Sequence, residues 1–183
     1  MTGKKNVFAI VGSASRHSTN ERLVLKLAEL GLDDFRISVF RDLKMLPHFD
    51  PELSVGETPE LVRKFRADIE AADAVIICTP EYVFSIPSGL KNAIEWCVST
   101  TVFTDKPLGI ITASADGQKG HEELQMIMRT VMASFTEETT LLIRGIKGKI
   151  DAEGAITDKQ TEDSLRKFVK RFKRLVDSRA EKS

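Results

Sequence analysis

The segment Ala74–Thr79, AVIICT, decides the fold, because its apolar residues follow one another without alternating with polar ones. A strand of this composition is buried on both faces, as in a parallel sheet covered by helices on each side. Helical patterns flank it. The preceding helix is predicted to begin with Thr58 as its N-cap and Pro59 as its first residue, and to run to Ala72. The following helix is predicted over residues 86–98.

Outward from this segment, short apolar runs continue to alternate with helical patterns. The predicted strands cover residues 7–11, 35–40, 106–114 and 139–143, and the predicted helices cover residues 19–30, 122–132 and a last stretch from about Asp158. This order predicts an α/β fold with a doubly wound five-stranded parallel sheet and helices on both faces, because right-handed crossovers leave few other topologies. The segment 145–154 is compatible with either a small hairpin or a loop.

Length and composition favour one globular domain, residues 1–183, with 42% hydrophobic and 30% charged residues. Lys and Arg total 27, and Asp and Glu also total 27, so the formal net charge is zero. A chain without excess positive charge has no general attraction to polyanions, which disfavours nucleic acid as a partner.

Membrane, secreted and metal-binding classes are also disfavoured. No apolar run approaches the roughly 20 residues that cross a bilayer, and the first residues show no signal-peptide cleavage pattern. The two cysteines, Cys78 and Cys97, are too few for a disulfide framework or a four-cysteine zinc site. We therefore expect a cytoplasmic protein with no membrane partner and no metal site.

Polar residues follow the first predicted strand, in the loop of residues 12–20, GSASRHSTN. In a doubly wound sheet, ligands bind beyond the carboxyl ends of the strands, where the strand order reverses. Hydroxyl and amide groups, the Arg16 guanidinium and the free N–H groups of the next helix together suit a phosphate. The loop lacks both the Gly-Lys-Ser/Thr of a Walker motif and the later glycines of a dinucleotide motif. An ordinary polar loop with Ser18 or Thr19 as helix N-cap explains the same residues equally well.

The loops after the third and fourth strands are also unusual. Residues 79–89 contain the single Tyr of the chain, Phe84 and two prolines, which limit backbone freedom and suit a flat ring ligand. The alternative is a rigid connector whose aromatic side chains pack on the sheet. Residues 112–121 are rich in small residues, and their glycines either let a ligand approach the backbone or simply form turns.

Together the three loops resemble those of the NADPH-dependent FMN reductase family, flavodoxin-like enzymes that include quinone, azo-dye and chromate reductases. The first family motif, Gly-Ser-x-Arg-x-x-Ser-x-Asn, is matched by Gly12, Ser13, Ser18 and Asn20, whereas Ser15 takes the place of the arginine and Arg16 follows it. The second motif, Pro-Glu-Tyr-Asn-x-Ser-x-Pro-x-x-Leu-Lys-Asn-x-x-Asp/Glu-Trp, is matched by Pro80, Glu81, Tyr82, Ser85, Pro87, Leu90, Lys91, Asn92, Glu95 and Trp96, and Val83 replaces its first asparagine. The third, glycine-rich loop matches through Ser114, Gly117 and Gly120.

The resemblance implies one flavodoxin-like domain that binds FMN and takes hydride from NADPH or NADH. It implies that the FMN phosphate lies against Ser13, Ser15, Arg16, Ser18, Thr19 and Asn20. It also implies that the isoalloxazine ring lies on Pro80, Glu81, Tyr82, Val83, Phe84 and Ser85, with Ser114, Ala115, Asp116 and Gly117 at its pyrimidine side. Because the flavin carries the chemistry, no catalytic side chain is expected.

By the same resemblance, the expected activity is NAD(P)H-dependent reduction of a small acceptor: a flavin, a quinone, an azo compound or a metal oxyanion. A homodimer or tetramer is expected, with the flavin near the interface. The helix at 86–98, with Leu90, Ile94 and Trp96, is the candidate contact surface with the partner subunit. Alternatively these side chains cover the sheet, and both can hold because different faces of one helix can serve each purpose. A non-enzymatic flavodoxin-like electron carrier is the main alternative, disfavoured because such carriers are strongly acidic. A regulatory module without flavin is a further alternative, supported by Val83 and the displaced arginine.

Overall fold

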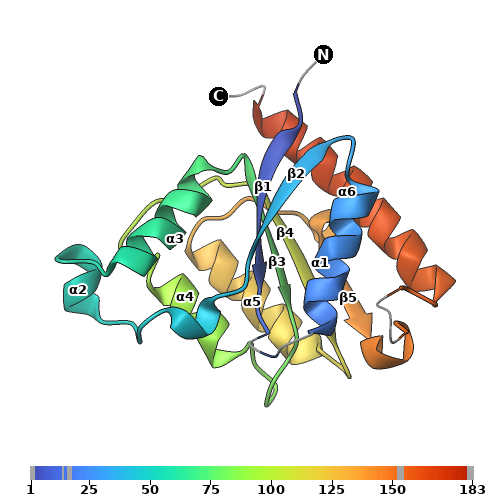
Figure 1. Ribbon diagram of the computed structural model, residues 1–183, viewed down its shortest axis with the longest axis horizontal. Coiled ribbons are helices and arrows are strands. Elements are labelled where there is room, and N and C mark those ends of the chain that lie inside the picture. The colour runs from blue at the N-terminus through green and yellow to red at the C-terminus, as the bar shows by residue number, and fades with distance from the viewer. Residues whose placement is uncertain (1–2, 14, 16–17, 152–154, 181–183) are drawn as a thin grey trace.

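The computed structural model describes residues 3–13, 15, 18–151 and 155–180, and the centre of this part is one parallel sheet (Figure 1). Its strands are β1 (Lys5–Val11), β2 (Phe35–Phe40), β3 (Ala74–Thr79), β4 (Leu108–Ser114) and β5 (Thr140–Arg144). Their order across the sheet is β2-β1-β3-β4-β5, and each neighbouring pair is parallel. The doubly wound five-stranded sheet predicted from the sequence is thereby confirmed.

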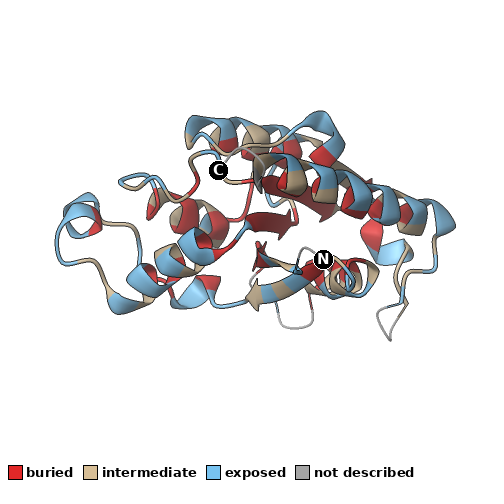
Figure 2. Ribbon diagram, turned by 90° about the horizontal axis from the view of Figure 1, so that it is seen from above, coloured by how far each residue is buried: buried red, intermediate tan, exposed pale blue. Residues whose placement is uncertain are grey.

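Helices cover both faces of this sheet (Figures 1 and 2). The helices α1 (Thr19–Leu30) and α6 (Lys159–Ala180) pack on one face, and α3 (Glu60–Ala71), α4 (Ser88–Glu95) and α5 (Gln118–Thr130) pack on the other. The connections contain the short helix α2 (Pro51–Val55) and the 3₁₀ turns η1 (Leu43–Met45), η2 (Glu137–Thr139) and η3 (Ile146–Gly148). Within the described ranges, no helix combines the length and the apolar composition that crossing a membrane requires.

The side chains of β1 show how the sheet supports two helical layers. Phe8 and Ile10 belong to the apolar cluster under α3, α4 and α5. Val7, Ala9 and Val11 belong to the cluster under α1 and α6. Successive side chains of a strand point to opposite faces, so one apolar strand supplies both clusters. The central strand β3 is buried along its whole length, as its unbroken apolar sequence predicts.

The strand order reverses beside β1. The chain passes from β1 through α1 to β2 on one side, and then crosses to β3 on the other side of β1. The helices that follow β1 and β3, α1 and α4, consequently cover opposite faces of the sheet. The loops leading into them separate at the carboxyl ends of the strands, which is where ligands bind in open α/β sheets.

Two helix boundaries beside β3 differ from the predictions. Pro59, not Thr58, occupies the N-cap position of α3, because the Thr58 hydroxyl donates to the carbonyl of Leu53 at 2.9 Å. Leu53 belongs to α2, which the sequence patterns did not predict and whose last carbonyls need donors. The helix predicted over residues 86–98 is shorter, since α4 spans Ser88–Glu95.

The apolar side chains around α4 face the core. Leu90, Ile94 and Trp96 are 0%, 2% and 0% exposed, respectively. The indole N–H of Trp96 donates to the carbonyl of Pro47 at 2.8 Å, which satisfies the polar atom of this buried ring. These three side chains therefore cover the sheet. A contact between a partner subunit and another face of this helix stays a prediction.

Candidate functional site

A cavity of about 560 Å³ lies at the carboxyl ends of β1, β3 and β4, where the strand order reverses. Small-molecule sites typically have volumes of roughly 300–1,000 Å³. The first loop contributes Ser13, Ser15, Ser18, Thr19 and Asn20, the second contributes Pro80 and Tyr82, and the third contributes Ser114 and Ala115, beside Ala113 of β4. A fourth segment, residues 145–148, completes the wall. The structure therefore brings the three predicted loops together around one cavity.

A larger hollow of about 660 Å³ lies elsewhere, between α3 and the edge strand β2. The charged side chains Arg41 and Lys64 on its rim are paired with Glu21 and Asp68. None of its lining residues belongs to the three loops at the carboxyl ends of β1, β3 and β4. The smaller cavity is the candidate site, because it lies at the carboxyl ends of the strands and is lined by the three loops; we call it the site cavity.

Gly12 sets the course of the first loop. Its N–H donates to the carbonyl of Cys78 at 2.8 Å, where β1 and β3 end side by side. A Cβ atom at Gly12 would lie 2.2 Å from the Oγ1 of Thr79, so only glycine allows this approach. Beyond Gly12 the loop leaves the sheet, and the N–H of Ser15 donates to the Oγ of Ser13 at 3.3 Å.

The N-terminus of α1 forms one wall of the site cavity. Ser18 is the N-cap residue, and its hydroxyl accepts a hydrogen bond from the N–H of Asn20 at 3.2 Å. The first N–H groups of a helix have no carbonyl partner within the helix and carry the positive end of its dipole. Ser18 thus caps the helix and also lines the cavity, so the two interpretations of this loop are compatible. Arg16, predicted at the same place, lies outside the described residues.

Asn20 anchors this wall to the sheet. Its side chain is 3% exposed and its amide group donates to the carbonyl of Ala113 at 3.2 Å. Its Oδ1 accepts from the thiol of Cys78 at 3.4 Å. Burial raises the pKa of the Cys78 thiol, which keeps it protonated and able to donate. Both ends of the Asn20 amide are therefore engaged, and the residue connects α1 to the ends of β3 and β4.

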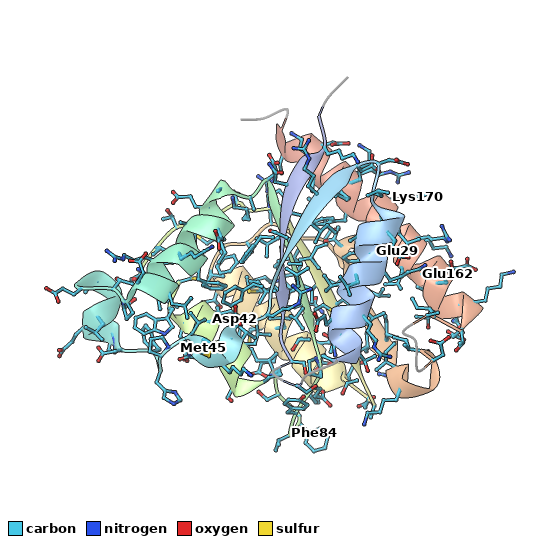
Figure 3. All side chains as sticks on the ribbon, viewed as in Figure 1. Glu29, Asp42, Met45, Phe84, Glu162 and Lys170 are labelled. Carbon is cyan, nitrogen blue, oxygen red and sulfur yellow. The ribbon has the colours of Figure 1, made fainter. Side chains whose placement is uncertain are left out.

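The second loop ends in a tight turn. Tyr82 and Ser85 exchange backbone hydrogen bonds of 2.9 and 3.0 Å. Between them, Val83 and Phe84 have φ angles of 52° and 60°, a left-handed conformation that Asn and Gly adopt far more readily. Their side chains are 93% and 75% exposed, and Figure 3 shows Phe84 projecting beyond the carboxyl ends of the strands. The alternative in which the aromatic side chains of this loop pack on the sheet is therefore wrong for Phe84.

Glu81 connects the second loop to the third. Its carboxylate accepts hydrogen bonds from the N–H groups of Gly117 at 3.3 Å and Gly120 at 2.8 Å. Gly117 is the N-cap residue of α5 and has no side chain to cap the helix. Glu81 performs this role from a distant segment, and α5 consequently begins at Gln118 rather than at Glu122, where the sequence pattern placed it.

Glu123 of α5 holds the other end of the turn. Its Oε2 accepts from the hydroxyl of Ser85 at 2.6 Å and from the N–H of Ile86 at 3.0 Å. Two carboxylates, Glu81 and Glu123, therefore fix both ends of the turn from Tyr82 to Ser85. The sequence pattern does not predict this role of Glu123, because a glutamate on an amphipathic helix is usually solvated and its partners are distant in the chain.

The third loop presents small groups to the site cavity. Ser114 and Ala115 line it, whereas the carboxylate of Asp116 pairs with Arg144 at 3.1 Å. Gly117 has a φ angle of 88°, which glycine adopts without a steric penalty. This turn directs the chain from β4 into α5 and leaves the backbone of the loop at the cavity edge.

A buried histidine connects the two elements on either side of the third loop, β4 and α5. His121 of α5 is 8% exposed, and its Nδ1 lies 2.8 Å from the Oγ1 of the fully buried Thr112 in β4. Burial lowers the pKa of His121, and the nearby Glu122 opposes this effect. The imidazole is therefore held neutral near pH 7 and links α5 to the end of β4.

The predicted cofactor residues fall into three groups. The cavity wall contains Ser13, Ser15, Ser18, Thr19, Asn20, Pro80, Tyr82, Ser114 and Ala115. The same loops hold Glu81, Val83, Phe84, Ser85, Asp116 and Gly117 outside that wall. Arg16 alone lies outside the described residues. The wall segment 145–148 was not predicted, and its two glycines around a 3₁₀ turn are the sole local signal for it.

Known proteins are similar to this chain over most of its length. The family described as NADPH-dependent FMN reductase matches residues 6–144 of this chain. The 2-hydroxy-1,4-benzoquinone reductase of a Burkholderia species is 32% identical over 180 residues, covering 94% of this chain and 97% of that protein. The quinone reductase of Escherichia coli is 28% identical over 175 residues, covering 90% of this chain and 92% of that protein.

A solved structure gives the same result for the fold. The flavoenzyme NAD(P)H:(acceptor) oxidoreductase FerB from Paracoccus denitrificans superposes with a TM-score of 0.77 at 26% sequence identity, covering 95% of this chain and 98% of that chain. The fold is thus flavodoxin-like, and the resemblance seen in the loop motifs is confirmed. Because the family match includes the first three loops of the site cavity and most of the chain, the protein belongs to the NADPH-dependent FMN reductase family of oxidoreductases.

Proposed function

We propose that the site cavity binds FMN and that this protein is an NAD(P)H-dependent quinone reductase, carried by one flavodoxin-like domain of residues 1–183. FMN and NAD(P)H are the cofactors expected of its family. The observation that carries the proposal is the lining of the site cavity. Hydroxyl groups and the N-terminus of α1 form part of the wall, and Pro80 and Tyr82 of the second loop form another part. Two relatives that match over nine-tenths of this chain or more are named as quinone reductases.

The groups present fit FMN. The proposed phosphate ligands are Ser13, Ser15, Arg16, Ser18, Thr19 and Asn20. The proposed ring contacts are Pro80, Glu81, Tyr82, Val83, Phe84 and Ser85, with Ser114, Ala115, Asp116 and Gly117 at the pyrimidine side. Among the described lining residues there is no carboxylate, so nothing there repels a phosphate dianion.

When bound, FMN supplies the hydride chemistry, and the residues of this chain bind and orient it. Glu81 and Glu123 position the loop proposed to carry the ring, because they fix both ends of its turn. Phe84 is 75% exposed, so its ring is accessible to a nicotinamide or a quinone. Backbone N–H groups of the third loop other than those of Gly117 and Gly120, which donate to Glu81, would favour negative charge at the pyrimidine side of the bound flavin.

Flavin binding and turnover together test the proposal. The purified protein mixed with FMN should retain a yellow chromophore through gel filtration, and NADPH should bleach it without oxygen. Ala115→Phe, which fills the cavity edge, should abolish FMN retention. Ala71→Phe, the same change on an exposed alanine of α3 outside the site cavity, should not. A correctly folded wild-type protein that takes up no FMN would overturn the proposal.

Turnover also separates the enzyme from the electron-carrier alternative, which the family match does not favour. Steady NADPH oxidation in the presence of a benzoquinone, with no second protein, is expected of the reductase. A carrier would bind FMN and exchange electrons slowly or not at all under those conditions. Competition among quinone, azo dye, free flavin and chromate then ranks the acceptors.

We also propose a cytoplasmic homodimer or tetramer. Supporting it, Val55 at the end of α2 and Val98 after α4 are 77% and 63% exposed, and they adjoin the hydrogen-bonded residues Ser54 and Ser99 in sequence. Light scattering of the FMN-loaded protein should give a dimer or tetramer mass, which Val98→Glu should reduce. A monomer at micromolar concentration would contradict this part of the proposal.

A further inference from the structure

In the part of the chain that the structure describes, one residue supplies the charge on the wall of the site cavity. Among the described lining residues, Lys147 alone has a charged side chain, and the others carry hydroxyl, amide or apolar groups. A phosphate ester carries up to two negative charges near neutral pH, and hydroxyl groups solvate this charge without neutralising it. The cation that faces the cavity from residues 145–148 is therefore a candidate ligand for a phosphate.

The backbone on both sides of Lys147 is fixed. Gly145, with a φ angle of 63°, turns the chain after β5, and its N–H donates to the carbonyl of Ala115 at 3.0 Å. Ile146 is 3% exposed and packs in the cluster under α1 and α6. The N–H of Gly148 closes the 3₁₀ turn on the carbonyl of Gly145 at 3.1 Å. Lys147 is thus held on the cavity wall by its neighbours, while its own side chain is exposed.

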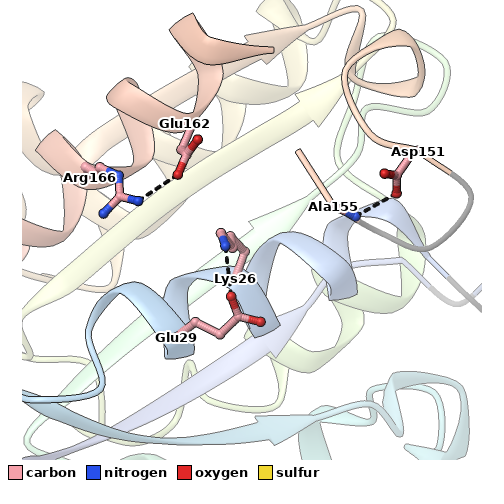
Figure 4. Close-up of polar contacts among 6 residues, drawn as sticks. All are labelled: Lys26, Glu29, Asp151, Ala155, Glu162 and Arg166. Carbon is pink, nitrogen blue, oxygen red and sulfur yellow. Dashed lines mark hydrogen bonds and ion pairs between the residues drawn. The ribbon is translucent and has the colours of Figure 1, made fainter. Parts of the chain in front are cut away.

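The segment after η3 is attached to the helix on the opposite wall. Arg22 of α1 donates to the carbonyl of Asp151 at 3.0 Å. The carboxylate of Asp151 accepts from the N–H of Ala155 at 2.8 Å, as Figure 4 shows. Since α1 also presents Ser18 and Thr19 to the cavity, one helix positions both the hydroxyl wall and the segment that bears the lysine.

The side chain of Lys147 has no hydrogen-bond or ion-pair partner among the described residues, whereas Lys149, two residues later, lies 3.9 Å from the carboxylate of Asp158. A lysine that is fixed at its backbone and unpaired at its ammonium group loses little when a ligand anion approaches, because no existing ion pair has to break. This distinguishes Lys147 from its neighbour, although the two side chains carry the same charge.

We propose that Lys147 is a binding residue of the site cavity whose ammonium group neutralises a phosphate ester of the bound nucleotide. The inference rests on the proposed function, because it requires a flavin or nicotinamide nucleotide in this cavity. The shared chemistry is a phosphate monoester, and two ligands can supply it: the terminal phosphate of FMN, or the 2′-phosphate that distinguishes NADPH from NADH.

Fluorescence titration of the apoprotein tests the first source. Lys147→Gln should weaken FMN binding about fivefold to tenfold, the scale of one partly exposed charge-assisted hydrogen bond. Binding of riboflavin, which has the same ring and no phosphate, should be unchanged. Lys147→Arg should restore FMN affinity. Lys149→Gln, an identical change outside the cavity wall, should alter FMN binding less than twofold.

Steady-state kinetics at saturating FMN test the second source. If the ammonium group binds the nicotinamide nucleotide, Lys147→Gln should raise KM for NADPH and leave KM for NADH unchanged, with FMN affinity preserved. Either pattern supports the inference and identifies the phosphate. Wild-type affinities for FMN, NADPH and NADH in Lys147→Gln would overturn it, while FMN binding by the wild-type protein would leave the proposed function standing.

Discussion

Replacing Glu81 tests how the candidate site is built, because this carboxylate caps α5 from the loop proposed to carry the flavin ring. Its two oxygens accept from Gly117 at 3.3 Å and from Gly120 at 2.8 Å. The N-cap residue of α5 has no side chain, so the structure shows no local substitute for this cap. Glu81→Ala leaves both N–H groups to water or without a partner.

The expected magnitude follows from the two bonds. A hydrogen bond to a charged group contributes about 1.5–3 kcal/mol, and the longer bond to Gly117 adds little. We expect Glu81→Ala to lower the free energy of unfolding by about 2 kcal/mol. For a chain of this length that corresponds to a decrease in Tm of about 4–8 °C. Glu81→Gln should lose about half as much, because its amide oxygen can still accept from Gly120 while its charge is gone.

Two measurements separate capping from a general loss of charge. Urea denaturation gives the free energy of unfolding, and amide hydrogen exchange should show faster exchange at Gly120 in Glu81→Ala. The matched control is Glu122→Ala, since Glu122 lies in the first turns of α5 but binds the side chains of Gln118 and Lys119. Equal destabilisation by the two alanine variants, with unchanged exchange at Gly120, would refute the capping argument.

Three other substitutions test separate features. Burial lowers the pKa of His121, so the unfolded chain binds its proton first, and the folded state should lose stability as pH falls below about 6.5, toward the lower folded pKa. Thermal unfolding at pH 7.5 and 5.5 should show this loss. His121→Gln should reduce the loss because a glutamine amide does not titrate, and the amide can still bond Thr112. Val83→Asn should raise the free energy of unfolding in urea by about 1 kcal/mol, because Asn tolerates a positive φ and the valine side chain is 93% exposed. Gly12→Ala should lower thermal stability by about 2 kcal/mol or more, because its Cβ would lie 2.2 Å from the Oγ1 of Thr79.

A specific measurement would contradict each of these three predictions. The same pH dependence in His121→Gln and wild type would assign the acid sensitivity to other groups. A destabilised Val83→Asn would mean that the valine side chain contributes contacts despite its exposure. A wild-type Tm for Gly12→Ala would show that the ends of β1 and β3 can separate without cost.

The strands and the larger helices could be predicted because their determinants are local. The bounds of α1, β2 and β3 coincide with the predicted ones, since apolar runs and a serine N-cap are visible in a single segment. The start of α5 could not be predicted, because its cap is the side chain of Glu81 rather than a neighbouring residue. Thr58 failed as a cap for a related reason: a free carbonyl of α2 lies within reach of its hydroxyl.

The residues of the candidate site also fall into two groups: those that local sequence predicts and those that distant contacts bring to the site. The motif residues that line the cavity lie just beyond the ends of strands, where the parallel sheet must bring them together. The segment 145–148 and Glu123 reach the site through tertiary packing. Residues 145–148 follow β5, which is not adjacent to the point where strand order reverses, so topology alone does not predict their contribution.

The turn at Val83 and Phe84 shows why such tertiary contacts matter for function. Both residues adopt a left-handed conformation that their side chains disfavour, and neither side chain gains burial in return. A strained turn persists only where its surroundings determine it, and here Glu81 and Glu123 do so through hydrogen bonds on either side. The strain is concentrated in two of the proposed ring contacts, Val83 and Phe84, and the turn is held by two carboxylates that do not line the cavity. If FMN binding uses this fixed geometry, Val83→Asn, which relaxes the turn, should raise the free energy of unfolding and leave FMN affinity unchanged. Glu123→Gln, which frees one end of the turn, should lower the free energy of unfolding and weaken FMN affinity.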